Sequence, residues 1–196
     1  QRPDAIRVDL RLIADMVDPG CRMLDIGCGE GALLAYLARH TNVDGRGIEL
    51  SMAGVNTCVR NGLSVIQGDA DTDLKAYPDG AFDWVVLSQT LQATRRPREV
   101  LEQLVRISRR AVVSFPNFAH WSIRSQLVFR GCMPVTGILP FHWYDTPNIH
   151  HCTIKDFVQT CRDADIEIEQ AIPLNGDGNP LDFSGTGRLA SMFAQQ

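Results

Sequence analysis

The stretch that decides the fold is DIGCGEG, residues 25–31, which ends a short apolar segment and precedes the apolar run 32–40. Glycines at 27, 29 and 31 let the backbone turn tightly and approach a ligand with no Cβ in the way. The first N–H groups of a helix that begins directly after such a turn stay free to bind a ligand. The stretch therefore predicts a strand, a glycine-rich turn and a helix, the opening unit of an α/β fold.

Strands and helices alternate outward from this turn. Besides a strand at 21–26, the apolar patterns predict strands at 45–50, 64–67, 82–87, 111–115 and from Ile166 onward. Helices are predicted at 6–17, 32–40, 51–60, 97–109 and 153–164. The nearly continuous apolar run at 82–87 is typical of a strand buried on both faces of a parallel sheet. The order predicts a doubly wound, mostly parallel, Rossmann-like sheet.

Residues 117–152 interrupt this alternation. They contain prolines and an aromatic cluster: Pro134, Pro140, Pro147, Phe141, Trp143 and Tyr144. The chain has 196 residues, which favours one domain with an embellishment over two separate domains. We therefore expect a single domain over 1–196, with 117–152 as an aromatic-rich insertion over the ligand or partner site, and a loop at 175–187.

Composition excludes several classes of protein. Apolar residues make up 44% of the chain and its net charge is −4, so it lacks the basic stripe that nucleic-acid binding requires. The longest apolar run, 32–38, is far shorter than the roughly 20 residues that span a bilayer, so no membrane span is expected. The six cysteines form no CxxC pair or metal-ligand spacing, which predicts reduced thiols in a cytoplasmic protein and no metal site. Because the first residue is Gln1 rather than Met, we expect a trimmed chain.

Two ligand classes fit the glycine turn. Gly27, Gly29 and Ala32 match the pattern GxGxxG/A, and Glu49 follows 22 residues beyond the first glycine, as in dinucleotide-binding loops. Asp25, however, ends the first strand, where a carboxylate repels a pyrophosphate and attracts a cofactor that carries ammonium and sulfonium charges. Glu49 ends the second strand, where it can accept hydrogen bonds from both hydroxyls of a ribose.

A third carboxylate extends this pattern. Asp69, after Gly68, ends the third predicted strand, where it can accept a hydrogen bond from an adenine amine. The series Asp-x-Gly-x-Gly-x-Gly, then Glu49, then Asp69, each at the carboxyl end of a strand, resembles the S-adenosylmethionine (SAM) site of the class I methyltransferases. The resemblance implies SAM or S-adenosylhomocysteine as ligand and a set of binding residues: Asp25, Gly27, Cys28, Gly29, Gly31, Glu49, Leu50, Asp69, Ala70 and Ser88.

Three of these residues have simpler interpretations. Gly31 can simply allow close packing of the helix against the strand, without a role in ligand binding. Asp69 can hydrogen-bond its own loop, where Asp71 and Asp73 lie nearby. Ser88 can line the methionine end of the cofactor or take part in ordinary polar packing. The sequence leaves these alternatives open.

The second half of the chain carries a more specific resemblance. Four strings resemble the MetW family of methionine-biosynthesis proteins: LSQTLQA (87–93), VSFPNFAHW (113–121), MPVT (133–136) and WYDTPNIH (143–150). Ala119, Cys132 and His151 depart from the family pattern. The resemblance implies a class I methyltransferase fold, a role tied to homoserine O-acylation, and a homoserine O-acyltransferase as partner. It also implies a seventh strand near Phe193, antiparallel between the fifth and sixth, so we expect the chain to be cut short at its end.

Two functions stay open. The chain either senses SAM and regulates the acyltransferase, with the aromatic-rich insertion as an interface, or it methylates an unidentified small molecule. Methyl transfer needs few catalytic groups, and the candidates for a base are His120, His142, Tyr144 and His150. A nicotinamide enzyme, a third hypothesis, rests only on the glycine turn. The sequence does not determine the oligomeric state.

Overall fold

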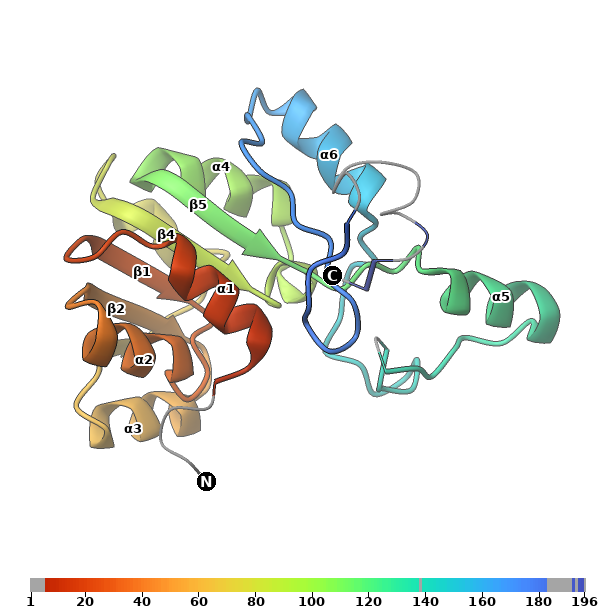
Figure 1. Cartoon of the computed structure of the whole chain (residues 1–196), viewed down its shortest axis with the longest axis horizontal. Helices are drawn as coiled ribbons and strands as arrows, with labels where there is room; N and C mark the ends of the chain where they lie inside the picture. The colour runs from red at the N-terminus through yellow and green to blue at the C-terminus, as the bar shows by residue number, and fades with distance from the viewer. Residues whose placement is uncertain (1–5, 138, 183–191, 193, 196) are drawn as a thin grey trace. The chain divides into compact units, whose positions relative to one another are not determined.

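The chain divides into two compact units, Gln1–Ser114 and Phe115–Gln196. The computed structural model describes residues 6–137, 139–182, 192 and 194–195. The first unit holds a sheet with its covering helices, and the described part of the second holds helices α5 and α6 and long irregular connections (Figure 1). The single domain predicted over 1–196, with its insertion over the ligand site, stays a prediction.

The first unit is built on a five-stranded parallel sheet. Its strands are β1 (Arg22–Ile26), β2 (Asp44–Glu49), β3 (Ser64–Gln67), β4 (Phe82–Ser88) and β5 (Ser108–Ser114), in the spatial order β3-β2-β1-β4-β5. The order reverses at β1, so the loop after β1 lies where open α/β sheets bind their ligands. The predicted doubly wound, Rossmann-like sheet is confirmed.

Helices cover both faces of this sheet. In the described part of the first unit they are α1 (Val8–Met16), α2 (Ala32–His40), α3 (Met52–Arg60) and α4 (Pro97–Ile107), with short 3₁₀ helices η1 (Asp73–Ala76) and η2 (Leu91–Ala93). One hydrophobic core joins α1, α2 and α3 to the sheet face on which Met23 and Val86 lie. Leu24 and Val85 alternate with them, point to the opposite face and are also buried, with α4 behind the sheet (Figure 1). Burial on both faces accounts for the apolar run in β4.

Two predicted boundaries shift where α4 meets β5. The helix ends at Ile107, two residues earlier than predicted, and the strand begins at Ser108. Ser108 already pairs with Phe82 of β4, and Arg110 pairs with Trp84. Hydrogen bonding to β4 therefore extends β5 to Ser108 and Arg110, although their polar side chains do not suggest a strand.

The strand predicted from Ile166 onward is wrong. Residues 165–173 contain no strand, and beyond them the described chain forms only an isolated antiparallel bridge between Leu174 and Pro180. Ile166 and Ile168 keep the alternating burial of a strand, but a strand also needs a neighbour that shares its backbone hydrogen bonds. None of the described strands pairs with this segment. The strand predicted near Phe193 lies outside the described residues.

The second unit contains α5 (Trp121–Arg130) and α6 (Ile154–Asp163). Helix α6 has its predicted cap, because Thr153 Oγ1 accepts a hydrogen bond from the N–H of Asp156. Helix α5 is not among the predicted helices, although it has ordinary start and stop signals. His120 caps its first turn, and Gly131 ends it with a φ of 64°.

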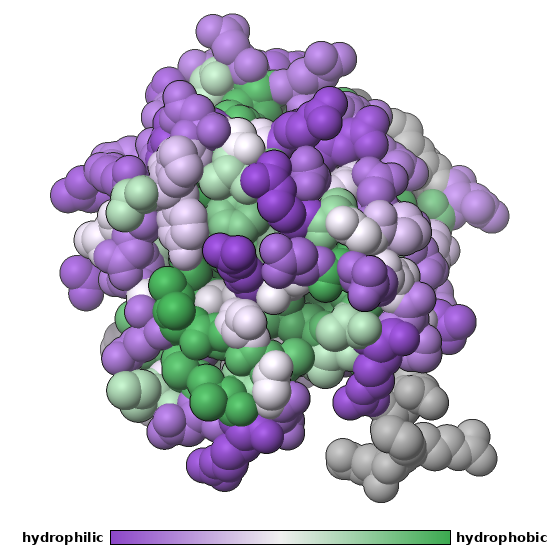
Figure 2. Space-filling view, turned by 90° about the vertical axis from the view of Figure 1, so that its left-hand side faces the viewer, coloured by the Kyte–Doolittle hydropathy of each residue, from purple (hydrophilic) through white to green (hydrophobic). Residues whose placement is uncertain are grey.

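Most of the side chains on one face of the molecule are hydrophilic (Figure 2). From the side at which the strands begin, hydrophilic side chains surround a smaller hydrophobic area in the lower half of the view (Figure 2). Within the described ranges, the helices are too short or too polar to cross a membrane.

Gly31→Ala tests how tightly the glycine turn packs α2 against α3. At Gly31 φ is 78°, and an added Cβ would collide with Leu63 Cδ1 and lie 2.9 Å from Cys58 Sγ. The variant combines backbone strain with overpacking, so we expect urea unfolding to show a loss of about 2–4 kcal/mol. Gly20→Ala is the matched control: φ is 70° there, but an added Cβ has no neighbour within 4 Å, so about 1–2 kcal/mol is expected. Equal losses in the two variants would contradict the packing role.

Candidate functional site

The glycine turn after β1 is fastened to the end of β2. The N–H groups of Gly27 and Cys28 both donate to the carbonyl of Ile48, at 2.8 and 3.2 Å. An added Cβ at Gly27 would lie 2.5 Å from Thr90 Oγ1, so this glycine, like Gly31, allows close packing. Gly29 differs, because its φ is 57° and an added Cβ would have no neighbour within 4 Å. The turn therefore leaves open space beside Gly29, which suits the approach of a ligand.

Glu49 is held in place at the end of β2. Its Oε2 accepts a hydrogen bond from the Gly29 N–H and its Oε1 one from the Ser51 N–H, both at 2.8 Å. Gly54 on α3 makes room for it, because a Cβ there would lie 2.8 Å from Glu49 Cγ and from the Gly29 carbonyl oxygen. An ionised carboxylate can accept about four hydrogen bonds, so Glu49 keeps capacity for ligand hydroxyls.

Asp25 is a buried carboxyl group at the end of β1. Its side chain is 4% exposed, and β1 and β2 run side by side with Asp25 opposite Gly47. Burial, and after it the negative charge of Glu49, raise the pKa of Asp25 to about 7. A cation bound beside the two carboxylates would favour the ionised form of both. The electrostatics of the turn therefore favour a positively charged ligand.

Asp69 has the local role that the sequence leaves open. Its Oδ1 accepts a hydrogen bond from the Asp71 N–H, and its own N–H donates to Asp73 Oδ2, both at 2.9 Å. Hydrogen bonds from the Asp69 N–H and the Thr72 hydroxyl lower the pKa of Asp73. Asp69 thus organises the loop after β3, and its second oxygen remains the candidate acceptor for a ligand.

The remaining predicted contacts lie in the glycine turn and at the ends of β2, β3 and β4. Leu50 is 66% exposed beside Glu49, which leaves an apolar surface at the end of β2, and Ala70 is half-buried. Ser88 Oγ lies 3.1 Å from Ser114 Oγ on the neighbouring β5, so the polar packing alternative is present. Burial, above all, raises the pKa of Cys28, so its thiol is not an activated nucleophile.

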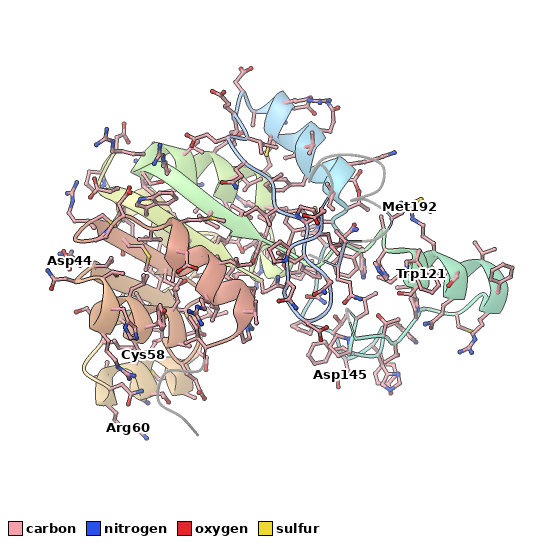
Figure 3. All side chains as sticks on the ribbon, in the orientation of Figure 1. Asp44, Cys58, Arg60, Trp121, Asp145 and Met192 are labelled. Atoms are coloured by element: carbon pink, nitrogen blue, oxygen red, sulfur yellow. The ribbon has the colours of Figure 1, made fainter. Side chains whose placement is uncertain are left out.

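The sequence did not single out Asp71 or Cys58, which support the site. Asp71 accepts hydrogen bonds from the N–H groups of Arg95 and Arg96, at 2.8 and 2.9 Å, and so ties the Asp69 loop to the start of α4. Cys58, buried on α3 (Figure 3), donates to the Gly29 carbonyl at 3.4 Å. An acidic residue directly before a helix predicts a helix cap. Asp71 could not be found in this way, because the helix whose start it binds begins about 24 residues later in the sequence.

The candidate bases belong to the second unit. His120 is buried, and its Nδ1 lies 2.7 Å from Ser122 Oγ and accepts from the Ser122 N–H. Its ring therefore caps α5. Tyr144 is exposed and stacks on His142, and His150 is exposed. Their catalytic roles stay predictions. Among the described residues, His, Cys, Asp and Glu side chains form no group that could hold a metal ion.

A sequence model of the family described as "Methionine biosynthesis protein MetW" matches residues 7–192. The chain belongs to the MetW family. A relative from Rhodopirellula baltica, the "Bifunctional methionine biosynthesis protein MetXA/MetW", is 32% identical over 176 residues, which cover 85% of this chain. The chain spans only 28% of the length of that relative. The resemblance carried by the four strings is thus confirmed.

Solved structures confirm the fold of this MetW-family chain. A SAM-dependent methyltransferase from Archaeoglobus fulgidus matches with a TM-score of 0.65 and 18% identity, over 95% of this chain and 87% of the other. A TehB-like SAM-dependent methyltransferase from Corynebacterium glutamicum gives a TM-score of 0.62 and 21% identity, over 92% and 84%. At these identities the likeness concerns the fold alone. The architecture is that of the SAM-dependent methyltransferases.

Asp25→Asn is expected to stabilise the free chain, and increasingly so as pH rises. The pKa of Asp25 is about 7 in the folded chain, against an ordinary value of 3.8, so the folded state holds the extra proton between these values. The wild type therefore loses stability as pH rises from about 4 to 7 and regains none above it. Asparagine carries no charge, so denaturant unfolding should give the variant an advantage of about 2–4 kcal/mol at pH 8 and much less at pH 5.

Asp73→Asn is the matched control. Its carboxylate is exposed and has a lowered pKa, so the substitution should remove stability at neutral pH rather than add it. An advantage of Asp25→Asn that is equal at pH 5 and pH 8 would mean that Asp25 is already ionised in the folded chain at pH 5.

Proposed function

We propose that this chain binds SAM or S-adenosylhomocysteine at the glycine turn and acts in methionine biosynthesis as a regulatory partner of a homoserine O-acyltransferase. The observation that carries the proposal is the buried Asp25 beside Glu49, next to the open space at Gly29. Two carboxylates in that position favour a cationic ligand, and SAM brings an ammonium and a sulfonium.

The surrounding groups fit the rest of SAM. Glu49 has acceptor capacity left for the two ribose hydroxyls, and Leu50 offers an apolar surface to the adenine ring. The free N–H groups at the start of α2 suit the carboxylate of the methionine part. A nicotinamide dinucleotide fits less well, because its pyrophosphate would lie near the carboxylates of Asp25 and Glu49. We therefore do not propose a nicotinamide enzyme.

The name of the Rhodopirellula baltica relative supports the partner. That protein is called a bifunctional methionine biosynthesis protein, MetXA/MetW, so its name joins a MetW part to a second functional part, MetXA. We identify this second part with the homoserine O-acyltransferase that the family resemblance implies. A domain that shares one polypeptide with an enzyme meets it at a high effective concentration. We propose the same association for this chain, in the cytoplasm, with SAM reporting the output of the pathway to the acyltransferase.

Calorimetric titration of the chain with SAM and with S-adenosylhomocysteine, alone and with the acyltransferase present, tests this function. SAM binding with an affinity that shifts when the partner is added is expected, because linkage makes the coupling reciprocal. SAM binding that ignores the partner would favour a methyltransferase, to be sought with labelled SAM and small-molecule extracts. If SAM does not bind, the proposal fails.

The same titration has an expected pH dependence. The cationic ligand requires ionised Asp25, whose pKa is about 7 in the free chain, so SAM should bind up to about tenfold more tightly at pH 8 than at pH 6. Proton release at pH 6 is measured by repeating the titration in buffers of different ionisation enthalpy. Asp25→Asn should weaken binding on the order of 10- to 100-fold and abolish the pH dependence. If Asp25→Asn keeps the wild-type affinity for SAM, Asp25 takes no part in SAM binding.

A further inference from the structure

Helix α5 carries hydrophobic side chains on two opposite sides. Ile123 is buried, whereas Val128 is 75% and Phe129 85% exposed, and Trp121 is half exposed (Figure 3). Trp121, Ser125, Val128 and Phe129 recur at the spacing of one helical stripe, opposite Ile123. A helix stripe of this kind normally faces a core. In the described part of the chain this one faces solvent.

A second exposed apolar segment belongs to the same unit. Phe141, Trp143, Tyr144 and Ile149 are exposed, and Trp143 packs edge-on against Tyr144 with ring centroids 5.7 Å apart. We call the α5 stripe and this segment together the apolar surface. Leu139, just before the segment, shares a small core with Ile123 of α5 and with Phe118.

The two parts of the apolar surface together expose about as much area as one side of a stable interface. The aromatic residues of this surface, Trp121, Phe129, Phe141, Trp143 and Tyr144, have side chains of about 150–250 Å² each and are between 45% and 85% exposed, so with Val128 and Ile149 the exposed side chains offer roughly 1,000 Å² in total. A standard interface buries about 800 Å² on each partner. The core of Phe118, Ile123 and Leu139 is small by comparison, so burial by a partner would stabilise the unit substantially.

The charge of the region narrows the kind of partner. Between residues 115 and 152, the Lys, Arg, Asp and Glu positions are only Arg124, Arg130 and Asp145. Depletion of charge is typical of the centre of a protein interface, whereas nucleic acid requires many basic residues. Two arginines against one aspartate leave the region slightly positive, although the whole chain has a net charge of −4. The complementary surface is therefore apolar at its centre and acidic at its rim.

We propose that the apolar surface, centred on Val128 and Phe129, is where the homoserine O-acyltransferase docks. This inference rests on the proposed function and adds the surface through which the partner is held. The area and the scarcity of charge fit a folded protein with an apolar patch. The ligand groups around Asp25 belong to the first unit, so docking and SAM binding use different residues of the chain.

The double substitution Val128→Gln with Phe129→Gln tests the docking surface. Glutamine keeps the helix propensity of α5 and removes the exposed apolar area. We expect the affinity for the acyltransferase, measured by calorimetry, to fall at least about tenfold, while the affinity for SAM stays at the wild-type value. Val105→Gln is the matched control, because Val105 is a half-exposed valine on α4 outside the apolar surface, and its variant should bind like the wild type.

The outcomes separate this inference from the proposed function. If the wild type does not bind the acyltransferase, the proposed function itself fails. If the wild type binds and the double variant binds equally well, the docking surface lies elsewhere. If light scattering shows a wild-type dimer that the double variant breaks, with acyltransferase affinity unchanged, the occupant is a second copy of this chain. Binding to phosphatidylserine vesicles that the double variant loses, with acyltransferase affinity unchanged, would likewise overturn the inference.

A second variant guards against unfolding of α5. Trp143→Gln changes the aromatic segment without touching the helix, and it should also weaken acyltransferase binding at least about threefold. Circular dichroism measures whether each variant keeps its helix content. Weaker binding in both variants with helix content unchanged supports the surface, and wild-type binding in Trp143→Gln would exclude the aromatic segment from it.

Discussion

Hydrogen bonds from the glycine turn to the end of β2 determine how the first unit is arranged. Gly27 and Cys28 donate to the Ile48 carbonyl, and Gly29 donates to the Glu49 carboxylate. These bonds require the left-handed φ values that glycine adopts without strain. Because the turn is held this closely to β2, Gly31 at the start of α2 lies against Cys58 of α3, and both helices join the same core. The core on that face and the position of Glu49 both follow from the same set of bonds.

The same arrangement brings the carboxylates of Asp25 and Glu49 together. The groups that shift the pKa of Asp25 include Glu49 but no positively charged side chain. In the free chain, ionising Asp25 therefore costs free energy of folding, and a bound cation would reduce that cost. The folding stability of the first unit is thus coupled to binding of its ligand. Active and binding sites commonly sacrifice stability in this way. In this chain the cost is located at one buried residue, Asp25. The loop that Asp69 organises is tied through Asp71 to the start of α4.

The second unit leaves many of its hydrophobic side chains exposed. Its small core of Phe118, Ile123 and Leu139 contrasts with the exposed hydrophobic side chains of α5 and of the segment around Trp143. The prolines at 134, 140 and 147 make the whole range 117–152 look irregular, so the sequence does not predict α5, although His120 and Gly131 mark its ends. Conversely, Ile166 and Ile168 alternate as in a strand and form none, because alternation describes burial and not the presence of a neighbouring strand.

The sequence by itself determined the α/β fold, the position of the glycine turn, the acidic residues at the strand ends and the MetW family. These features depend on local patterns: apolar periodicity, glycine spacing and short strings of residues. Only the tertiary structure decided that Gly31 serves packing while Gly29 faces open space, that Asp69 bonds its own loop, and that Asp71 ties that loop to α4. The physical reason is that each of these roles depends on which distant atoms come within about 3–4 Å, and local sequence patterns do not encode those distances.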